Sequence, residues 1–418
     1  MNLSFRPLLP LLTVLLLVHF PAQSQRHGAP RQTDHPWRGS TRTWNPRILT
    51  GADRMELYLP MLKGRTIAIF ANQTATIGSS HLVDTLLKEG IHIAKIFSPE
   101  HGFRGDADAG EHVNSAVDPK TGISIISLYG SKRKPSAADL EGVDIMLFDI
   151  QDVGVRFYTY ISSLQEYLES AIENHRPLII LDRPNPNGYY VDGPVLDKKF
   201  KSFVGMQPIP TVYGMTIGEY AKMLMGEHWL DTAATAAAAG AQVTIIPCKY
   251  YTHHSKYILP VKPSPNLPNM QSIYLYPSLC LFEGTAISLG RGTDKPFQQF
   301  GHPSFPKNLY HFTPASLPGA KNPPLLNQTC YGYDLSNIDV SRVTKGRLSL
   351  QWIIRAYKLF PDKEHFFLAG NFFNKLAGND TLQQQIKDGL TEDQIRQSWQ
   401  PALDNFKTIR KKYLLYAE

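Results

Sequence analysis

The chain has 418 residues, more than a single hydrophobic core usually fills, so two domains are expected. Hydrophobic residues make up 42% of the sequence and charged residues 19%, which excludes a chain that is disordered throughout. The net charge is +7, but beyond residue 47 basic and acidic residues are mixed. No basic stripe alternates with aromatic residues there, so a nucleic-acid partner is not expected.

The N-terminus has the pattern of a secretory signal. A positively charged start with Arg6 is followed by an apolar core at residues 8–20 and by the small residues of Ala22-Gln23-Ser24. Residues 1–24 are therefore predicted to be a signal peptide. Its apolar core is too short for a membrane span and no later stretch qualifies, so stable membrane insertion after cleavage is not expected.

Residues 25–47 are predicted to be a disordered basic spacer. This segment contains several arginines but one acid, Asp34, and Pro, Gly, Ser and Thr are frequent in it. Together with the signal, this arrangement predicts an exported protein, either periplasmic or secreted.

From Gly51 onward, strand-like apolar runs alternate with helix-like segments. Strands are predicted at residues 66–70, 92–97, 123–129, 144–150, 177–182 and 242–247, and helices at 82–90, 158–175 and 215–226, with a short helix from Ser136. This alternation predicts an α/β fold with a parallel, doubly wound, Rossmann-like sheet.

The pattern changes after Tyr250, where clean strand–helix units become rare. A proline-rich crossing at residues 262–269 is typical of a boundary between domains. We therefore expect an N-terminal domain at residues 48–268 and a smaller α+β domain at residues 269–418.

Polar side chains gather where predicted strands end. Ser98-Pro99-Glu100-His101-Gly102 follows the strand at 92–97 and offers a carboxyl group beside an imidazole, a pair suited to proton transfer. In open α/β sheets, ligands bind beyond the carboxyl ends of the strands. The alternative is a loop whose acid and histidine are merely solvated.

Three further strand ends in the first domain carry similar groups. The segment 149–160 brings Asp152 and Arg156 close to tyrosines, and a guanidinium can bind both oxygens of a carboxylate. An Asp–Arg ion pair that fixes the loop is the alternative. Asn72-Gln73 and Asn185 follow other strands and suit sugar hydroxyls, although simple turn chemistry explains them equally well.

The second domain supplies one more candidate group. Glu283 precedes Gly290-Arg291-Gly292-Thr293, whose glycines allow a ligand to approach the backbone closely. Glu283 is thus a second candidate carboxylate, on the opposite wall of a cleft between the domains. A salt bridge between Glu283 and Arg291 is the structural alternative.

The sequence motifs of several common enzyme classes are absent from this chain. The first strand–helix turn, residues 72–78, has no G-x-G-x-x-G, and the chain has no P-loop, so a dinucleotide or nucleoside triphosphate is not expected. There is no H-E-x-x-H, and His253-His254 has no partners in sequence, which argues against a metal. No G-x-S-x-G is present either. We expect neither a metal nor a cofactor.

Taken together, the motifs resemble the NamZ-type exo-β-N-acetylmuramidases, from about residue 50 to the C-terminal end. The resemblance is carried by Ala71-Asn72-Gln73-Thr74, Ser98-Pro99-Glu100-His101-Gly102, Asp149-Gln151-Asp152-Gly154-Arg156-Tyr158-Tyr160, Asp182-Arg183-Pro184-Asn185, Glu283-Gly284-Thr285, Gly290-Arg291-Gly292-Thr293 and Tyr413-Leu414-Leu415-Tyr416. It implies a Rossmann-like catalytic domain with a C-terminal domain closing the cleft. It also implies release of terminal, non-reducing N-acetylmuramic acid (MurNAc) from peptidoglycan fragments such as MurNAc-GlcNAc, in cell-wall recycling.

The resemblance also suggests roles for individual residues. Glu100 is expected to be the acid on the leaving oxygen, with His101 orienting it. Glu283 is the first candidate, and Asp152 the second, for the group that acts as nucleophile, base or stabiliser. If the N-acetyl group of the substrate is itself the nucleophile, this carboxylate only orients it. Substrate contacts are expected from Asn72, Gln73, Arg156, Tyr158, Tyr160, Asn185, Arg291 and Thr293, with Arg156 or Arg291 on the lactyl carboxylate. A protein that binds muramyl sugars without cleaving them is the alternative.

Overall fold

A computed structural model describes residues 47–100, 102–104 and 116–418. The predicted signal peptide, nearly all of the predicted spacer and His101 lie outside these residues. Across the part of the chain that is described, no helix has both the length and the apolar character needed to cross a membrane.

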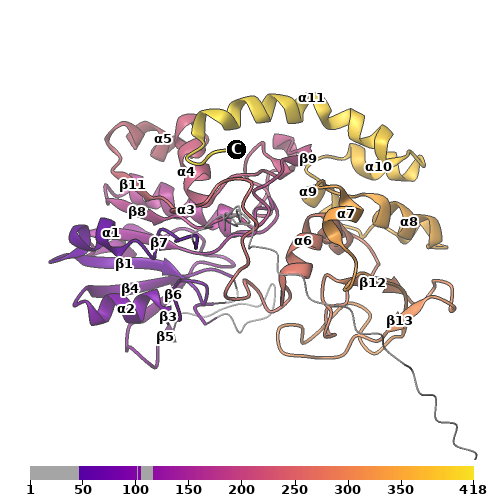
Figure 1. Ribbon diagram of the computed structural model, residues 1–418, viewed down its shortest axis with the longest axis horizontal. Helices are drawn as coiled ribbons and strands as arrows, with labels where there is room; N and C mark the ends of the chain where they lie inside the picture. Colours follow the sequence, from indigo (N-terminus) through magenta and orange to yellow (C-terminus); the bar gives the residue numbers. More distant parts are fainter. Residues whose placement is uncertain (1–46, 101, 105–115) are drawn as a thin grey trace, which may run out of the picture. The chain divides into compact units, whose positions relative to one another are not determined.

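A sheet of seven strands organises the first part of the chain, in the order β11-β8-β7-β1-β4-β6-β5 (Figure 1). Its strands are β1 (Thr66–Ala71), β4 (His92–Ser98), β5 (Ala116–Val117), β6 (Ser124–Ser127), β7 (Ile145–Asp149), β8 (Leu178–Leu181) and β11 (Val243–Ile246). All neighbours pair in parallel except β5, which runs antiparallel to β6. The predicted doubly wound parallel sheet is confirmed.

Helices cover both faces of this sheet because successive strand residues point in opposite directions. In β1, Ile67 and Ile69 pack toward α1 (Met55–Leu62) and α2 (Leu82–Lys88). Ala68 and Phe70 face the other core, which contains the buried sides of the remaining helices. Those helices are α3 (Tyr160–Glu173), α4 (Ile217–Gly226) and α5 (Thr232–Ala237). Apolar residues on both faces explain why the strands have continuous apolar runs.

Short elements complete the first part. They are the hairpins β2 (Thr76–Ile77) with β3 (Ser80–His81) and β9 (Asp192–Val195) with β10 (Pro210–Val212), and the 3₁₀ turns η1 (Ala137–Leu140), η2 (Lys198–Phe200) and η3 (Ala238–Gly240).

The C-terminal domain is a smaller α+β unit. An antiparallel sheet in the order β12-β14-β13 packs with helices that begin at α6. Its elements are α6 (Met270–Leu279), η4 (Cys280–Gly284), β12 (Gln299–His302), β13 (Tyr310–Phe312), β14 (Cys330–Asp334), α7 (Val340–Thr344), α8 (Gln351–Leu359), η5 (Lys363–His365), α9 (Phe372–Ala377), α10 (Thr381–Lys387), α11 (Glu392–Arg410) and η6 (Lys411–Tyr413). The boundary at residues 268/269 stays a prediction.

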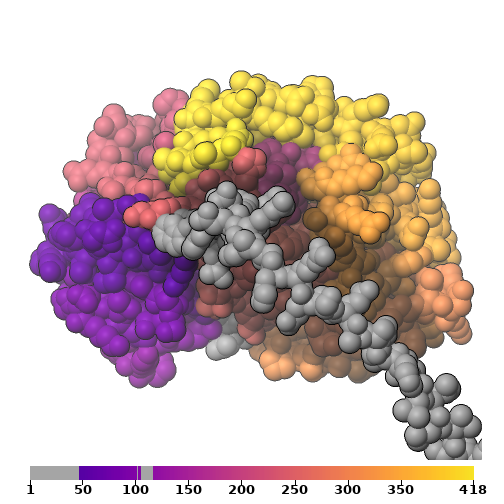
Figure 2. All heavy atoms as spheres, in the orientation of Figure 1, coloured from indigo at the N-terminus to yellow at the C-terminus, as the bar shows by residue number. Residues whose placement is uncertain are grey.

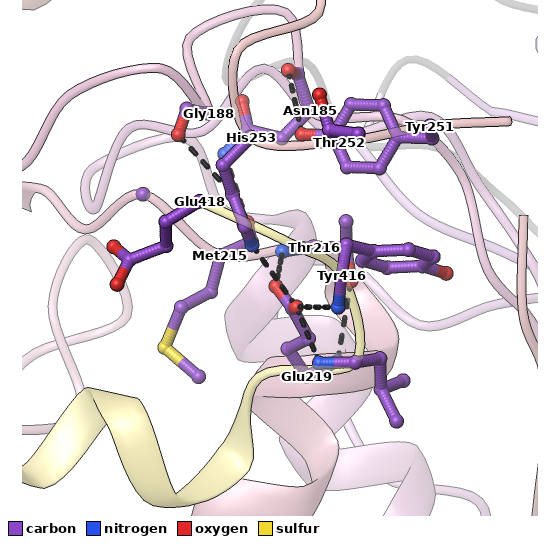
Figure 3. Close-up of polar contacts among 12 residues, drawn as sticks. Asn185, Gly188, Met215, Thr216, Glu219, Tyr251, Thr252, His253, Tyr416 and Glu418 are labelled. Atoms are coloured by element: carbon purple, nitrogen blue, oxygen red, sulfur yellow. Dashed lines mark hydrogen bonds and ion pairs between the residues drawn. The ribbon is translucent and has the colours of Figure 1, made fainter.

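The C-terminus returns to the first domain. Helix α11 lies at the surface (yellow in Figure 2), and its Arg396 pairs with both oxygens of Asp192 in β9 at 2.7 Å. Beyond it, the backbone N–H of Leu415 donates to Oε1 of Glu219 at 2.8 Å, and Nε2 of His253 lies 3.0 Å from the same oxygen (Figure 3). Tyr416 donates its hydroxyl to Asp182 at 2.6 Å. The tail thus satisfies acids buried at the start of α4 and the end of β8.

Candidate active site

A cavity of about 850 Å³ opens at the carboxyl-end edge of the sheet and is lined by residues of both domains. Its size falls in the range typical of small-molecule sites. Among the described residues, the charged side chains that line it are Glu100, Arg133, Glu283 and Arg291. Aromatic side chains supply much of the remaining wall, including Phe157, Tyr158, Phe203, Tyr276, Phe282 and Phe297.

Glu100 enters the cavity from the loop that follows β4. Its Oε1 accepts a hydrogen bond of 2.9 Å from the hydroxyl of Tyr129, and its Oε2 accepts one of 3.2 Å from Thr159. Tyr129 follows the neighbouring strand β6, and Thr159 directly precedes α3. Burial and the nearby Glu100 raise the pKa of Tyr129, so its hydroxyl keeps its proton and donates.

Glu283 reaches the cavity from η4 and is held by Arg291. Both Nε and Nη2 of Arg291 contact Oε1 of Glu283, at 2.9 and 2.5 Å, while the thiol of Cys280 lies 3.4 Å from Oε2. Burial lowers the pKa of Arg291, but the Glu283 carboxylate outweighs that effect and raises it overall. The salt-bridge alternative is therefore what the structure contains, inside the cavity.

The two carboxyl groups have different surroundings. Among the described contacts, Glu100 accepts hydrogen bonds from the hydroxyl groups of Tyr129 and Thr159, and Glu283 is paired with Arg291. Most glycoside hydrolases use two carboxyl groups, one as the acid and the other as nucleophile or base.

Arg156 does not reach the cavity. Its side chain is fully buried, and its two terminal nitrogens donate to the backbone carbonyls of Pro194, Ile209, Leu376 and Ala377 at 2.7 to 2.9 Å. These donors are used within the protein, so the expected fork for a substrate carboxylate is not available at Arg156. It instead connects the β9–β10 hairpin to α9.

Three other expected ligand-binding side chains contact the proline-rich crossing, and a fourth contacts one of them. Tyr158 and Tyr160 donate to the carbonyl of Pro263 at 3.0 and 3.2 Å, and Nε2 of Gln73 donates to it at 3.1 Å. Asn72 donates to the hydroxyl of Tyr160 at 2.9 Å. Of the four, Tyr158 lines the cavity, and the others hold the backbone behind it.

Asp152, Asn185 and Thr293 are also placed outside the cavity lining. Oδ2 of Asp152 accepts hydrogen bonds from Tyr213 at 2.5 Å and from a backbone N–H, and burial raises the pKa of Asp152 to about 6. Asn185 donates to the carbonyl of Met215 at 2.8 Å, and Thr293 donates to that of Gly290 at 2.7 Å. All three make local structural contacts.

The sequence interpretation missed the cavity residues Tyr129, Arg133, Thr159 and His302. Tyr129 could have been predicted, because it ends the predicted strand at 123–129. Ligands bind beyond the carboxyl ends of such strands, so this position was as good a candidate as the others. Arg133 had no such signal. In the part of the chain that the structure describes, no group of three His, Cys, Asp or Glu side chains is placed to hold a metal ion.

A sugar-sized cavity with two differently held acids, beyond the carboxyl ends of a parallel sheet, is typical of an α/β glycoside hydrolase. The models of the exo-β-N-acetylmuramidase NamZ family match this chain over residues 67–271 (N-terminal) and 274–416 (C-terminal). The chain belongs to this family.

Similar proteins agree with that assignment. The peptidoglycan β-N-acetylmuramidase NamZ of Bacillus subtilis (strain 168) is 37% identical over 390 residues, covering 89% of this chain and 92% of the relative. Crystal structures of two DUF1343-family proteins from Bacteroides fragilis NCTC 9343 match with TM-scores of 0.81 and 0.74, at 48% and 26% identity. Each match covers 89% of this chain and 100% of the other.

Proposed function

We propose that this protein is an exo-acting glycoside hydrolase that releases terminal, non-reducing MurNAc from peptidoglycan fragments such as MurNAc-GlcNAc during cell-wall recycling. Membership of the NamZ family supports the activity. The observation that carries the mechanism is the presence of Glu100 and Glu283 in one cavity with different partners.

In the proposed reaction, Glu100 gives its proton to the glycosidic oxygen, so the GlcNAc part leaves as an alcohol. Its hydrogen bonds to Tyr129 and Thr159 fix the direction of the carboxyl group. Glu283 keeps its negative charge beside Arg291 and faces the positive charge that develops on the sugar ring.

A water molecule then supplies the hydroxyl group at C1 of the released MurNAc. Glu283 serves as nucleophile, as base for the water, or as stabiliser when the N-acetyl oxygen attacks C1. Direct attack by water, with Glu283 as base, inverts the configuration at C1, whereas the other two routes retain it; inverting enzymes also keep the two carboxyl groups farther apart than enzymes that form a covalent intermediate. Analysis of the first-formed anomer by NMR distinguishes inversion from retention.

The first experiment measures MurNAc release from MurNAc-GlcNAc by the wild type, Glu100→Gln and Glu283→Gln. We expect release by the wild type and a loss of at least about 10²-fold in each variant, since general-acid catalysis contributes on that order. The matched control is Glu89→Gln, an exposed carboxyl group at the end of α2. Tight binding of the disaccharide by the wild type without release would instead support the binding-protein alternative.

We also propose that the protein acts after export, in the periplasm or outside the cell. The signal-like sequence at residues 1–24 supports this location. Fractionation of cells that express the full chain, compared with a chain lacking residues 2–24, tests it. Equal retention of both proteins in the cytoplasm would contradict export.

A further inference from the structure

The cavity contains a second arginine that forms no salt bridge with a described residue. Arg133 and Arg291 are the arginines among the described lining residues, and Arg291 is paired with Glu283. Within the described part of the chain, no acid lies in salt-bridge distance of Arg133. The remaining basic residue of the lining is His302, whose pKa is lowered by burial, so it is neutral at neutral pH.

Arg133 is held in a defined orientation. It lies in the segment after β6, three residues beyond Gly130, which adopts a φ of 90° that favours glycine. Nε of Arg133 donates to the carbonyl of Gly130 at 3.2 Å, and the guanidinium lies 4.3 Å from the ring centroid of Phe203. A guanidinium fixed through Nε and stacked on an aromatic ring has lost much of its freedom while both terminal nitrogens can still donate.

The same segment also supplies Tyr129, which holds Glu100. A substrate group bound by Arg133 would therefore be aligned with the acid by a stretch of five residues. MurNAc differs from GlcNAc by its lactyl ether, which adds one carboxylate. The cavity has to distinguish the two sugars through that group.

We propose that Arg133 binds the lactyl carboxylate of MurNAc and is the residue by which the enzyme selects muramic acid at its terminal subsite. This inference rests on the proposed function. It replaces the expected role of Arg156, whose terminal nitrogens are bonded to backbone carbonyls, and of Arg291, which is paired with Glu283. Arginine suits this task because its planar fork matches the two oxygens of a carboxylate.

The test compares a chromogenic β-MurNAc with its lactyl methyl ester, which lacks the negative charge and is larger by one methyl group. For the wild type we expect kcat/KM to be roughly 10- to 100-fold higher on the acid than on the ester, as for one charged hydrogen-bonded pair. Arg133→Gln should bring this ratio close to one by lowering activity on the acid alone. Arg133→Lys should keep part of the preference, since it keeps the charge but not the fork.

Lys132→Gln is the matched control, because it removes the same charge from the adjacent residue, whose exposed side chain does not line the cavity. Its acid-to-ester ratio should equal that of the wild type. A wild type without preference for the acid, or an Arg133→Gln variant that keeps the preference, overturns the proposal. Equal losses on both substrates in Arg133→Gln also overturn it.

Binding of free MurNAc and its methyl ester to Glu100→Gln, measured by calorimetry with and without Arg133→Gln, separates this proposal from the proposed function. If the preference for the acid disappears with Arg133 while the wild type cleaves nothing, the carboxylate site stands and the hydrolase assignment fails. If cleavage occurs and binding does not depend on Arg133, the hydrolase assignment stands and the carboxylate site at Arg133 fails.

Discussion

Tyr129 donates a hydrogen bond of 2.9 Å to Glu100, although the two residues follow different strands, β6 and β4. They meet because β4 and β6 are parallel neighbours whose carboxyl ends reach the same edge of the sheet. The raised pKa of Tyr129 keeps the hydroxyl protonated over the working pH range. The tyrosine is therefore a permanent donor that fixes one oxygen of the candidate acid.

Replacement of Tyr129 by Phe should lower kcat by about 10-fold with little change in KM, since the loss of one hydrogen bond to a charged or reacting carboxyl group is worth about 1.5 kcal/mol. The measurement is steady-state kinetics on MurNAc-GlcNAc. Tyr331→Phe, in β14 and outside the lining, is the control. An unchanged kcat in Tyr129→Phe would show that this hydroxyl does not position Glu100.

Glu283 and Arg291 are expected to act as one unit. Since Nε and Nη2 of Arg291 both contact one oxygen of Glu283, removal of either partner leaves the other misplaced and its charge uncompensated. We expect Glu283→Gln and Arg291→Gln each to reduce kcat/KM by on the order of 10²-fold, and the double variant to be no worse than the poorer single one. Additive losses in this cycle would show that the two side chains contribute independently.

Asp152 gives the folded protein a predictable pH dependence. Burial raises its pKa from 3.8 to about 6. The folded state therefore binds a proton more tightly than the unfolded state, so this contribution to stability is complete below pH 3.8 and is lost as the pH rises through 6. The full loss is about 3 kcal/mol, because one pKa unit corresponds to about 1.4 kcal/mol.

Asp152→Asn should remove that dependence. Asn has no charge to desolvate, and its amide nitrogen would occupy the place of Oδ1, which has no hydrogen-bond partner in the structure. Relative to the wild type, the unfolding free energy of the variant should increase by about 2 to 3 kcal/mol between pH 4 and pH 7.5, measured by urea denaturation. Glu89→Gln, an exposed site, should give a difference that does not vary with pH. A pH-independent difference for Asp152→Asn would show that its carboxyl group does not titrate as described.

The sequence predicted the sheet and its functional edge because both depend on local patterns. Apolar runs such as 144–150 indicate buried strands wherever they occur, and parallel strands necessarily bring their carboxyl ends together. Glu100 was found in this way, whereas Glu283, which was expected at a strand end, lies in η4 after α6; both line the cavity. The placement of the two acids in different domains followed from the predicted boundary in the proline-rich crossing.

The same reasoning could not tell which polar side chains at that edge face the ligand. Arg156 finds its four carbonyl acceptors 38 to 221 residues away in sequence, and Tyr160 meets Pro263 at a separation of 103. Contacts at such separations depend on how the chain packs. An arginine beside a strand end therefore looks the same in the sequence whether it binds a substrate or a buried backbone. Arg133 lies in a loop that no sequence pattern marks, so the sequence predicted neither role for it.

The structural role of Arg156 leads to the last prediction. Its guanidinium neutralises carbonyl dipoles of the β9–β10 region and of α9, and no acid is bonded to it among the described residues. Arg156→Lys keeps a charge but offers fewer, differently directed donors, so buried carbonyls lose their partners. We expect the free energy of unfolding to fall by about 3 to 5 kcal/mol, as for other broken buried polar networks.

Urea denaturation of Arg156→Lys measures this loss, with Arg65→Lys at an exposed position as the control. The kinetic constants of the folded variant on MurNAc-GlcNAc supply the second readout. If Arg156 instead binds the substrate carboxylate, the variant would keep its stability and show a raised KM for MurNAc-GlcNAc. Stability lost from Arg156 and carboxylate selectivity lost from Arg133 would assign the two arginines to packing and to recognition, respectively.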